Sequence, residues 1–79
     1  MGDVDSAIKE LGVAVKIDPG SAFAYYNLAE AYMIKGLNGE AVLYLKKFLR
    51  TSDPERDAEL RRKAMERIST LEASSDILP

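Results

Sequence analysis

The chain has 79 residues and contains no cysteine, histidine or tryptophan, so we expect one small domain without a disulfide or a structural zinc ion, whose stability must come from packed apolar faces. The same absences exclude Cys–His and Ser–His–Asp catalysis, and nothing else in the sequence points to an enzyme, a cofactor or a metal site. Eleven Lys and Arg residues against 13 Asp and Glu residues give a net charge of −2, which argues against a nucleic-acid partner.

Glycine, proline and small polar residues divide the chain into four segments. In each segment apolar residues recur at i, i+3, i+4 and i+7, and none shows the alternation typical of a strand, which predicts an all-α fold. The apolar runs are too short for a membrane span or a signal peptide, so we expect a cytoplasmic protein with no membrane contact. The predicted helices cover residues 4–17, 22–35, 40–50 and 55–72.

The helices differ in how their apolar residues are arranged. The first has a single apolar face, which contains Val4, Ala7, Ile8, Leu11, Ala14 and Val15. The second has two apolar stripes, made of Tyr25, Leu28, Ala29 and Tyr32 and of Phe23, Tyr26 and Met33. The third groups Ala41, Val42, Leu45, Phe48 and Leu49. The fourth aligns Leu60, Ala64, Ile68 and Leu71 among charged residues.

Residues suited to helix ends lie at the expected boundaries. Asp3 or Asp5 can cap the first helix, and Asp53 before Pro54 can cap the fourth, because a carboxylate accepts hydrogen bonds from the first free N–H groups. Gly36 fits the left-handed conformation that ends many helices. The short connections favour antiparallel neighbours, and residues 74–79 are expected to be a frayed tail.

The sequence also repeats itself with a period of 34 residues. Shifting the first helix by this number places Ala7 on Ala41 and Leu11 on Leu45. The two Asp-Pro pairs, at 18–19 and 53–54, align with one inserted residue. Such a period indicates stacked helical units that bury one another's faces.

The spacing of the apolar residues resembles the tetratricopeptide repeat (TPR). The family pattern W-x2-L-G-x2-Y, A-x3-F and P is matched here by Tyr25-x2-Leu28-Ala29-x2-Tyr32, Ala41-x3-Leu45 and Pro54. The resemblance implies an α-solenoid of antiparallel helical hairpins, in which Tyr25, Leu28 and Tyr32 fill the seam between the paired helices. It divides a single domain, residues 1–79, into the second helix of a partial repeat at 2–19, a complete repeat at 20–54 and a capping helix at 55–73.

The resemblance also implies a site. In TPR proteins the first helix of each pair lines a concave groove that binds a peptide or helix of a partner protein, and a stripe of the second predicted helix occupies these positions. Some TPR domains grip a C-terminal carboxylate, for which Asn27 and Arg62 are suitably placed, but Phe23 and Ala58 stand where that site needs lysines. The groove residues implied in this chain are Phe23, Tyr26, Asn27, Glu30, Met33 and Ile34. The alternative is that Phe23 and Tyr26 simply pack against flanking helices.

The first helix suggests a second kind of interaction. Its apolar residues Val4, Ile8, Leu11 and Val15 would be uncovered if no helix preceded them, and such a face is costly to leave in water. We therefore expect either a homo-oligomer or a fragment of a longer TPR array. The function favoured by the sequence is a protein-binding scaffold or adaptor, and the alternative is a self-association element.

Overall fold

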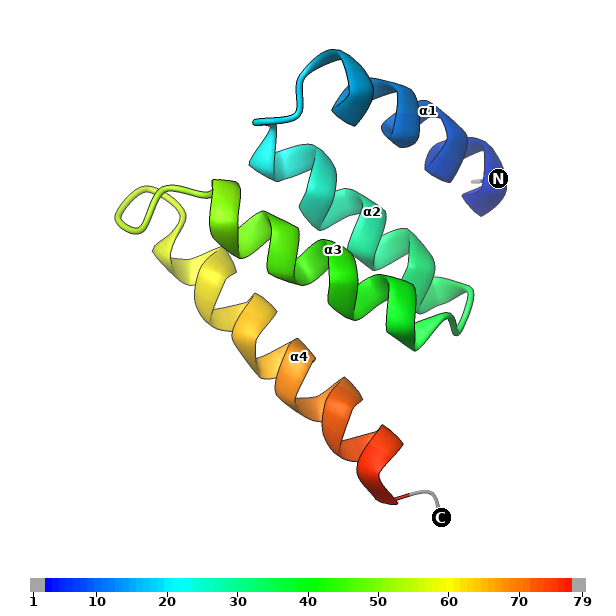
Figure 1. The fold of residues 1–79 in the computed structure, drawn as a ribbon, viewed down its shortest axis with the longest axis vertical. Helices are drawn as coiled ribbons and strands as arrows, with labels where there is room; N and C mark the ends of the chain where they lie inside the picture. Colours follow the sequence, from blue (N-terminus) through cyan, green and yellow to red (C-terminus); the bar gives the residue numbers. More distant parts are fainter. Residues whose placement is uncertain (1–2, 78–79) are drawn as a thin grey trace.

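The computed structural model describes residues 3–77, with the side chains of residues 74–77 excepted. It contains four helices, α1 (Val4–Ile17), α2 (Ala22–Ile34), α3 (Asn38–Thr51) and α4 (Ala58–Ile77). Consecutive helices run in opposite directions and stack in chain order, so that α2 lies between α1 and α3 (Figure 1). The predicted all-α architecture of helical hairpins is therefore confirmed.

Local hydrogen bonds explain where the first helices begin and end. The backbone N–H groups of Asp5 and Ser6 donate to the Asp3 carboxylate, at 3.1 and 3.4 Å, so Asp3 is the cap of α1. The Ser21 hydroxyl accepts from the N–H of Ala24 at the start of α2. Gly36 has a φ of 78° after the end of α2, which confirms the left-handed residue predicted there.

The connection between α3 and α4 is a hydrogen-bonded turn rather than the first turn of a helix. Asp53 accepts from the N–H groups of Glu55 and Arg56, both at 2.8 Å, and Asp57 accepts from the N–H of Asp53 at 2.9 Å. Regular helix begins only at Ala58, later than the predicted residue 55, because these turns bind the backbone N–H groups first.

The end of α4 also differs from the prediction. The helix continues to Ile77 instead of ending at residue 73, while residues 78 and 79 of the expected tail lie outside the described residues. The segment from Ala73 to Asp76 contains no glycine or proline, and the next residue that opposes a helix is Pro79.

The core lies where α2, α3 and α4 meet. Leu45 is completely buried and Phe48 is 1% exposed, and both belong to α3. One alanine on each of the three helices is also completely buried, and its small size allows the neighbouring helix to approach. These residues are Ala29, Ala41 and Ala64.

Aromatic stacking joins α2 to α3. The Tyr44 ring lies parallel to that of Tyr32, with ring centroids 5.5 Å apart, and stacks on Tyr25 at 6.2 Å. The ammonium group of Lys47 lies 5.4 Å from the centre of the Tyr44 ring. The predicted seam of tyrosines between the paired helices is therefore confirmed.

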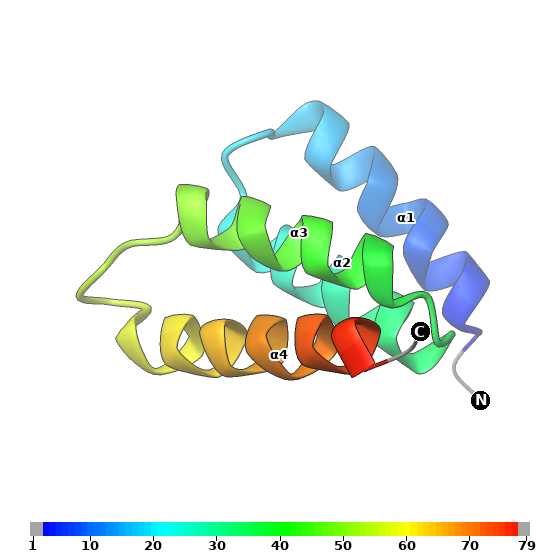
Figure 2. The ribbon, with the colours of Figure 1, turned by 60° about the horizontal axis from the view of Figure 1, so that its bottom comes forward.

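Helix α4 covers one side of the α2–α3 pair (Figure 2). Leu60, Ile68 and Leu71 pack against the core beside the buried Ala64, as predicted for the inward face of this helix. Lys63 and Arg67 are exposed. The outer surface of α4 is therefore charged where the equivalent stripe of α2 is apolar.

Candidate partner-binding groove

An open groove of about 780 Å³ lies between helices α1 and α2. Its apolar lining comes from both helices and consists of Val4, Ala7, Leu11, Ala31 and Ile34. Its polar lining consists of Asp3, Glu10, Asn27 and Glu30. The groove therefore combines an apolar surface with three carboxylates, as binding sites often combine an apolar lining with a few polar groups.

Three of the six predicted groove residues line this groove. They are Asn27, Glu30 and Ile34, and Ile34 is 71% exposed at the end of α2. Because they are spaced by three and four residues, the helical turn places them in one row facing α1.

The other three predicted groove residues lie elsewhere. Tyr26 is 9% exposed and packs edge-to-face against Phe48, with ring centroids 5.1 Å apart. Met33 faces α4, where its sulfur lies 3.4 Å from Arg67. Phe23 is 67% exposed and borders a separate hollow near the α3–α4 connection.

Helix geometry explains this separation. Each residue turns the helix by about 100°, so Tyr26 and Met33 point about 70 to 90° away from the middle of the row that contains Asn27 and Glu30. That rotation directs them toward α4 and the core. The predicted groove set therefore joined residues from two neighbouring faces of α2, and in the structure one of these faces packs toward α4 and the core while the other faces α1.

The predicted self-association residues are also divided. Val4 and Leu11 line the groove, whereas Val15 packs against the core, and Ile8 is half-buried. The four side chains do not form one free face, because α2 covers part of α1.

The most exposed apolar residues of α1 are two that the sequence analysis did not include. Val13 is 52% exposed and Ile17 is 80% exposed. Both lie outside the i, i+3, i+4 pattern by which the apolar face was chosen. Only their apolar character, and not their spacing, could have pointed to them from the sequence.

Ion pairs set the charge around the groove. The Glu30 carboxylate lies 3.3 Å from the Arg67 guanidinium, which links the groove to α4. Lys35 pairs with Asp5 at the end where α1 begins and α2 ends, and this hydrogen bond raises the pKa of the Lys35 ammonium group. The Ser6 hydroxyl donates to Asp3 and lowers the pKa of that carboxyl group, so Asp3 is an anion at neutral pH.

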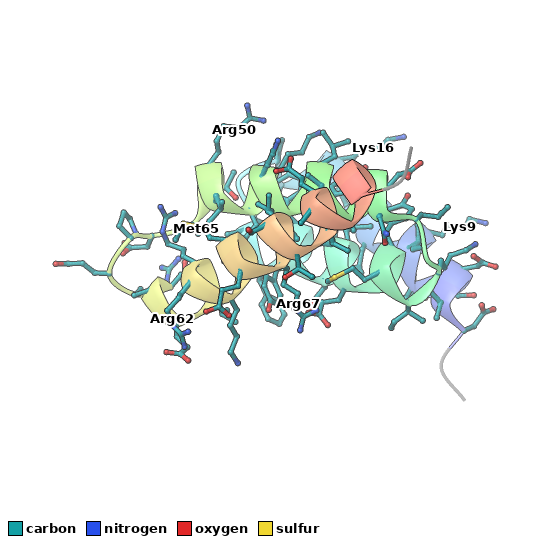
Figure 3. The ribbon with its side chains drawn as sticks, turned by 90° about the horizontal axis from the view of Figure 1, so that it is seen from below. Lys9, Lys16, Arg50, Arg62, Met65 and Arg67 are labelled. Carbon is teal, nitrogen blue, oxygen red and sulfur yellow. The ribbon has the colours of Figure 1, made fainter. Side chains whose placement is uncertain are left out.

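The residues considered for a carboxylate site lie apart. Asn27 lines the α1–α2 groove, whereas Arg62 forms ion pairs within α4, at 2.9 Å to Glu59 and 3.0 Å to Glu66. In Figure 3 the Arg62 side chain points away from the other helices. Its positive charge is directed into solvent and balanced within its own helix.

Comparison with known proteins identifies the repeat. Residues 1–36, which contain α1 and α2, match the sequence model of the TPR repeat family. This part of the chain is therefore similar to a TPR repeat. No curated protein and no solved structure matches the chain. The TPR match spans the groove, and the division of the chain into a partial repeat, a complete repeat and a capping helix stays a prediction.

The TPR period relates the groove to the core. At the 34-residue period, Leu11 and Ala7 of α1 correspond to Leu45 and Ala41 of α3, both of which are completely buried. On α1 the same two positions are half-buried. The groove therefore includes two positions whose equivalents on α3 lie in the core. Within residues 3–77, no helix is long and apolar enough to cross a membrane.

Proposed function

We propose that the chain is a protein-binding module, a scaffold or adaptor without enzymatic activity, which holds a segment of a partner protein in the α1–α2 groove. The observation that carries this proposal is the half-burial of Leu11 at a position whose repeat equivalent, Leu45, is completely buried. Burial of apolar surface is the main favourable term in protein association, and this surface is already shaped by two helices. The TPR match supports a protein partner, and the cytoplasm remains the predicted location.

The binding residues in this proposal differ in part from those expected at first. Asn27, Glu30 and Ile34 on α2 are retained, and Val4 and Leu11 on α1 are added as the opposite wall. Asn27 offers both a donor and an acceptor beside the apolar lining, so it can fix the position of a bound backbone.

Selection from a displayed peptide library tests this function. The purified chain is the bait, and enriched peptides are synthesised and measured by fluorescence anisotropy. Leu11→Glu places a charge in the groove and is expected to weaken binding at least about 10-fold. Val13→Glu is the matched control, because Val13 is on the same helix, 52% exposed and outside the groove lining.

The control distinguishes a local effect from unfolding. Both variants are checked by circular dichroism for the helix content of the parent chain. If no peptide is enriched, or if Leu11→Glu binds as well as Val13→Glu, the groove is not the binding site.

A second candidate function is self-association through α1. It is favoured by the exposure of Val13 and Ile17, which are large apolar side chains on one helix. Sedimentation equilibrium of the parent chain and of Val13→Glu tests it. A homo-oligomer that Val13→Glu dissociates supports this function, and a monomer at high micromolar concentration contradicts it.

A further inference from the structure

The start of α3 carries two adjacent residues whose chemistry plays no part in the proposed binding function. Asn38 is the first residue of this helix and Gly39 is the second. The chain has two asparagines, and Asn38 is the one that glycine follows. We propose that Asn38 is a modification site, at which the Gly39 backbone nitrogen displaces the side-chain amide and water then leaves aspartate or isoaspartate at residue 38.

The reaction is a cyclisation followed by a hydrolysis. The backbone nitrogen of Gly39 gives up its proton to base and forms a bond to Cγ of Asn38. The bond from Cγ to the side-chain nitrogen breaks, and that nitrogen takes a proton from water and leaves as ammonia. Water then opens the cyclic imide, at Cγ to give aspartate or at the main-chain carbonyl carbon to give isoaspartate. One water is consumed and one ammonia is released, so no oxidant or cofactor is required.

The structure leaves the attacking nitrogen free. Leu37, which precedes α3, provides no side-chain cap. Among residues 3–77 the N–H of Gly39 donates no hydrogen bond, and the bonds of α3 begin with the N–H of Ala41, which donates to Leu37 O at 3.0 Å. A Cβ placed on Gly39 would meet no atom within 4 Å. Neither a hydrogen bond nor a neighbouring side chain therefore protects this nitrogen.

The first turn of α3 can open without disturbing the core. Opening is required, because the torsions of a regular helix hold the Gly39 nitrogen away from Asn38 Cγ. Residues 38–40 are all exposed, and complete burial begins at Ala41. Fraying of such a helix end costs terminal hydrogen bonds and little apolar burial, and glycine in the first turn favours it further. The reactive conformation is therefore accessible in the folded chain.

Asn27 provides a contrast within the same chain. It lies in the middle of α2, and Leu28, which follows it, is 1% exposed. Reaction at Asn27 requires α2 to unfold and a nitrogen next to a branched side chain to attack. We therefore expect Asn27 to stay intact in the folded chain while Asn38 reacts.

The two products differ in their effect on the α2–α3 hairpin. Aspartate places a negative charge at the start of α3, where the helix dipole favours it. Isoaspartate adds a methylene group to the main chain, which prevents a regular first turn and the hydrogen bond from Ala41 to Leu37. Because α3 carries the buried Leu45 and Phe48, isoaspartate should lower the melting temperature, whereas Asn38→Asp should not.

Timed incubation at neutral pH and physiological temperature tests the proposal. The parent chain is compared with Leu37→Ser, which supplies the missing cap, and with Gly39→Ala, which adds a methyl group beside the nitrogen. Leu43→Ser is the matched control, because Leu43 is 48% exposed and lies beyond the first turn, while Leu37 is 40% exposed. Each chain is incubated in native buffer and in concentrated urea, and its helix content is measured by circular dichroism. Mass spectrometry of proteolytic peptides measures conversion at Asn27 and Asn38, and an isoaspartyl-specific methyltransferase identifies isoaspartate.

In native buffer the parent chain is expected to convert at Asn38 and to retain Asn27. Leu37→Ser should slow the conversion about 5-fold, because a serine cap holds the first turn closed, and Leu43→Ser should react like the parent. In urea no helix start remains, so the parent and Leu37→Ser should react at the same rate. Gly39→Ala should be at least about 10-fold slower in both solvents, because its methyl group hinders the nitrogen and narrows the accessible torsions.

Three results would overturn the proposal. Asn38 that stays intact in native buffer but reacts in urea would mean that the helix start protects it. Equal rates for the parent and Leu37→Ser in native buffer would rule out opening of the first turn as the route. Equal conversion at Asn27 and Asn38 would mean that the whole chain unfolds before it reacts. If Leu37→Ser loses helix content, the parent in the two solvents and Gly39→Ala still decide the outcome.

Discussion

The repeat provides a direct test of how open the groove is, because Leu11 and Leu45 hold equivalent positions on α1 and α3. Leu45 is completely buried in the core, whereas Leu11 is half-buried and lines the groove. Replacing each by alanine removes the same atoms from a helix interior, and the helix propensities of Leu and Ala are close enough for that term to cancel.

The two substitutions should differ in their effect on the free energy of unfolding. At Leu45 the surrounding helices cannot close around the missing side chain, so the loss is about 3 to 5 kcal/mol. At Leu11 the space opens into the groove and no sealed cavity forms, so only the transfer term of about 1 to 2 kcal/mol is lost. A chain of this length has a total stability of about 4 to 12 kcal/mol, so Leu45→Ala brings it close to unfolding.

Urea denaturation followed by circular dichroism measures both values. We expect Leu11→Ala to retain a complete folding transition, with a cost at least about 1 kcal/mol smaller than that of Leu45→Ala. Equal costs would refute the reasoning, because they would mean that Leu11 is as enclosed in solution as Leu45. Sedimentation equilibrium at the same concentration would then show whether a second copy encloses it.

Three further predictions concern the backbone, a connecting contact and pH. Gly36→Ala should lower the free energy of unfolding by about 1 kcal/mol, because the φ of Gly36 is 78°. Gly12→Ala should raise it by about 0.5 to 1 kcal/mol, because Gly12 lies in the middle of α1 with open space around the new Cβ. Thermal denaturation distinguishes the two signs. Arg61→Ala should cost about 1.5 to 3 kcal/mol, measured by urea denaturation, because Arg61 donates to Leu49 O at 2.7 Å and to Ser52 Oγ at 2.6 Å across the α3–α4 connection. The Ser6 hydroxyl, followed by backbone N–H groups, lowers the pKa of Asp3, and backbone N–H groups lower the pKa of Asp53. The folded state therefore holds these protons less tightly than the unfolded state, and the melting temperature should fall as the pH drops below about 4. An Asp3→Asn, Asp53→Asn double variant with the same pH profile as the parent chain would contradict the last of these.

Most of the fold was predictable because each element carries its own local signal. The 3.6-residue periodicity marked all four helices, and Asp3 and Gly36 marked helix ends by chemistry that acts within a few residues. The errors fell at the two ends of α4. There the turns around Asp57 delayed the start of the helix, and the absence of a breaker before Pro79 let it continue.

The site was less predictable because periodicity identifies a face without identifying what covers it. Tyr26 and Asn27 are adjacent on α2, but one is buried against Phe48 and the other lines the groove. The packing of α3 against one side of α2 and of α1 against the other separates them. In the same way, Leu11 and Val15 share a face of α1, yet Val15 packs against the core and Leu11 lines the groove.

The sequence by itself determined the helices, the 34-residue period and the seam of Tyr25, Leu28 and Tyr32, because propensity, capping and spacing act locally and the repeat aligns equivalent positions. Only the tertiary structure decided that the predicted partner-binding residues are divided between different surfaces. It also decided that Asn27, Glu30 and Ile34 of that set meet Val4 and Leu11 of the predicted self-association set in one acidic groove. That outcome depends on how far each helix covers its neighbour. The packing of several helices against one another decides this, and the sequence of one helix does not.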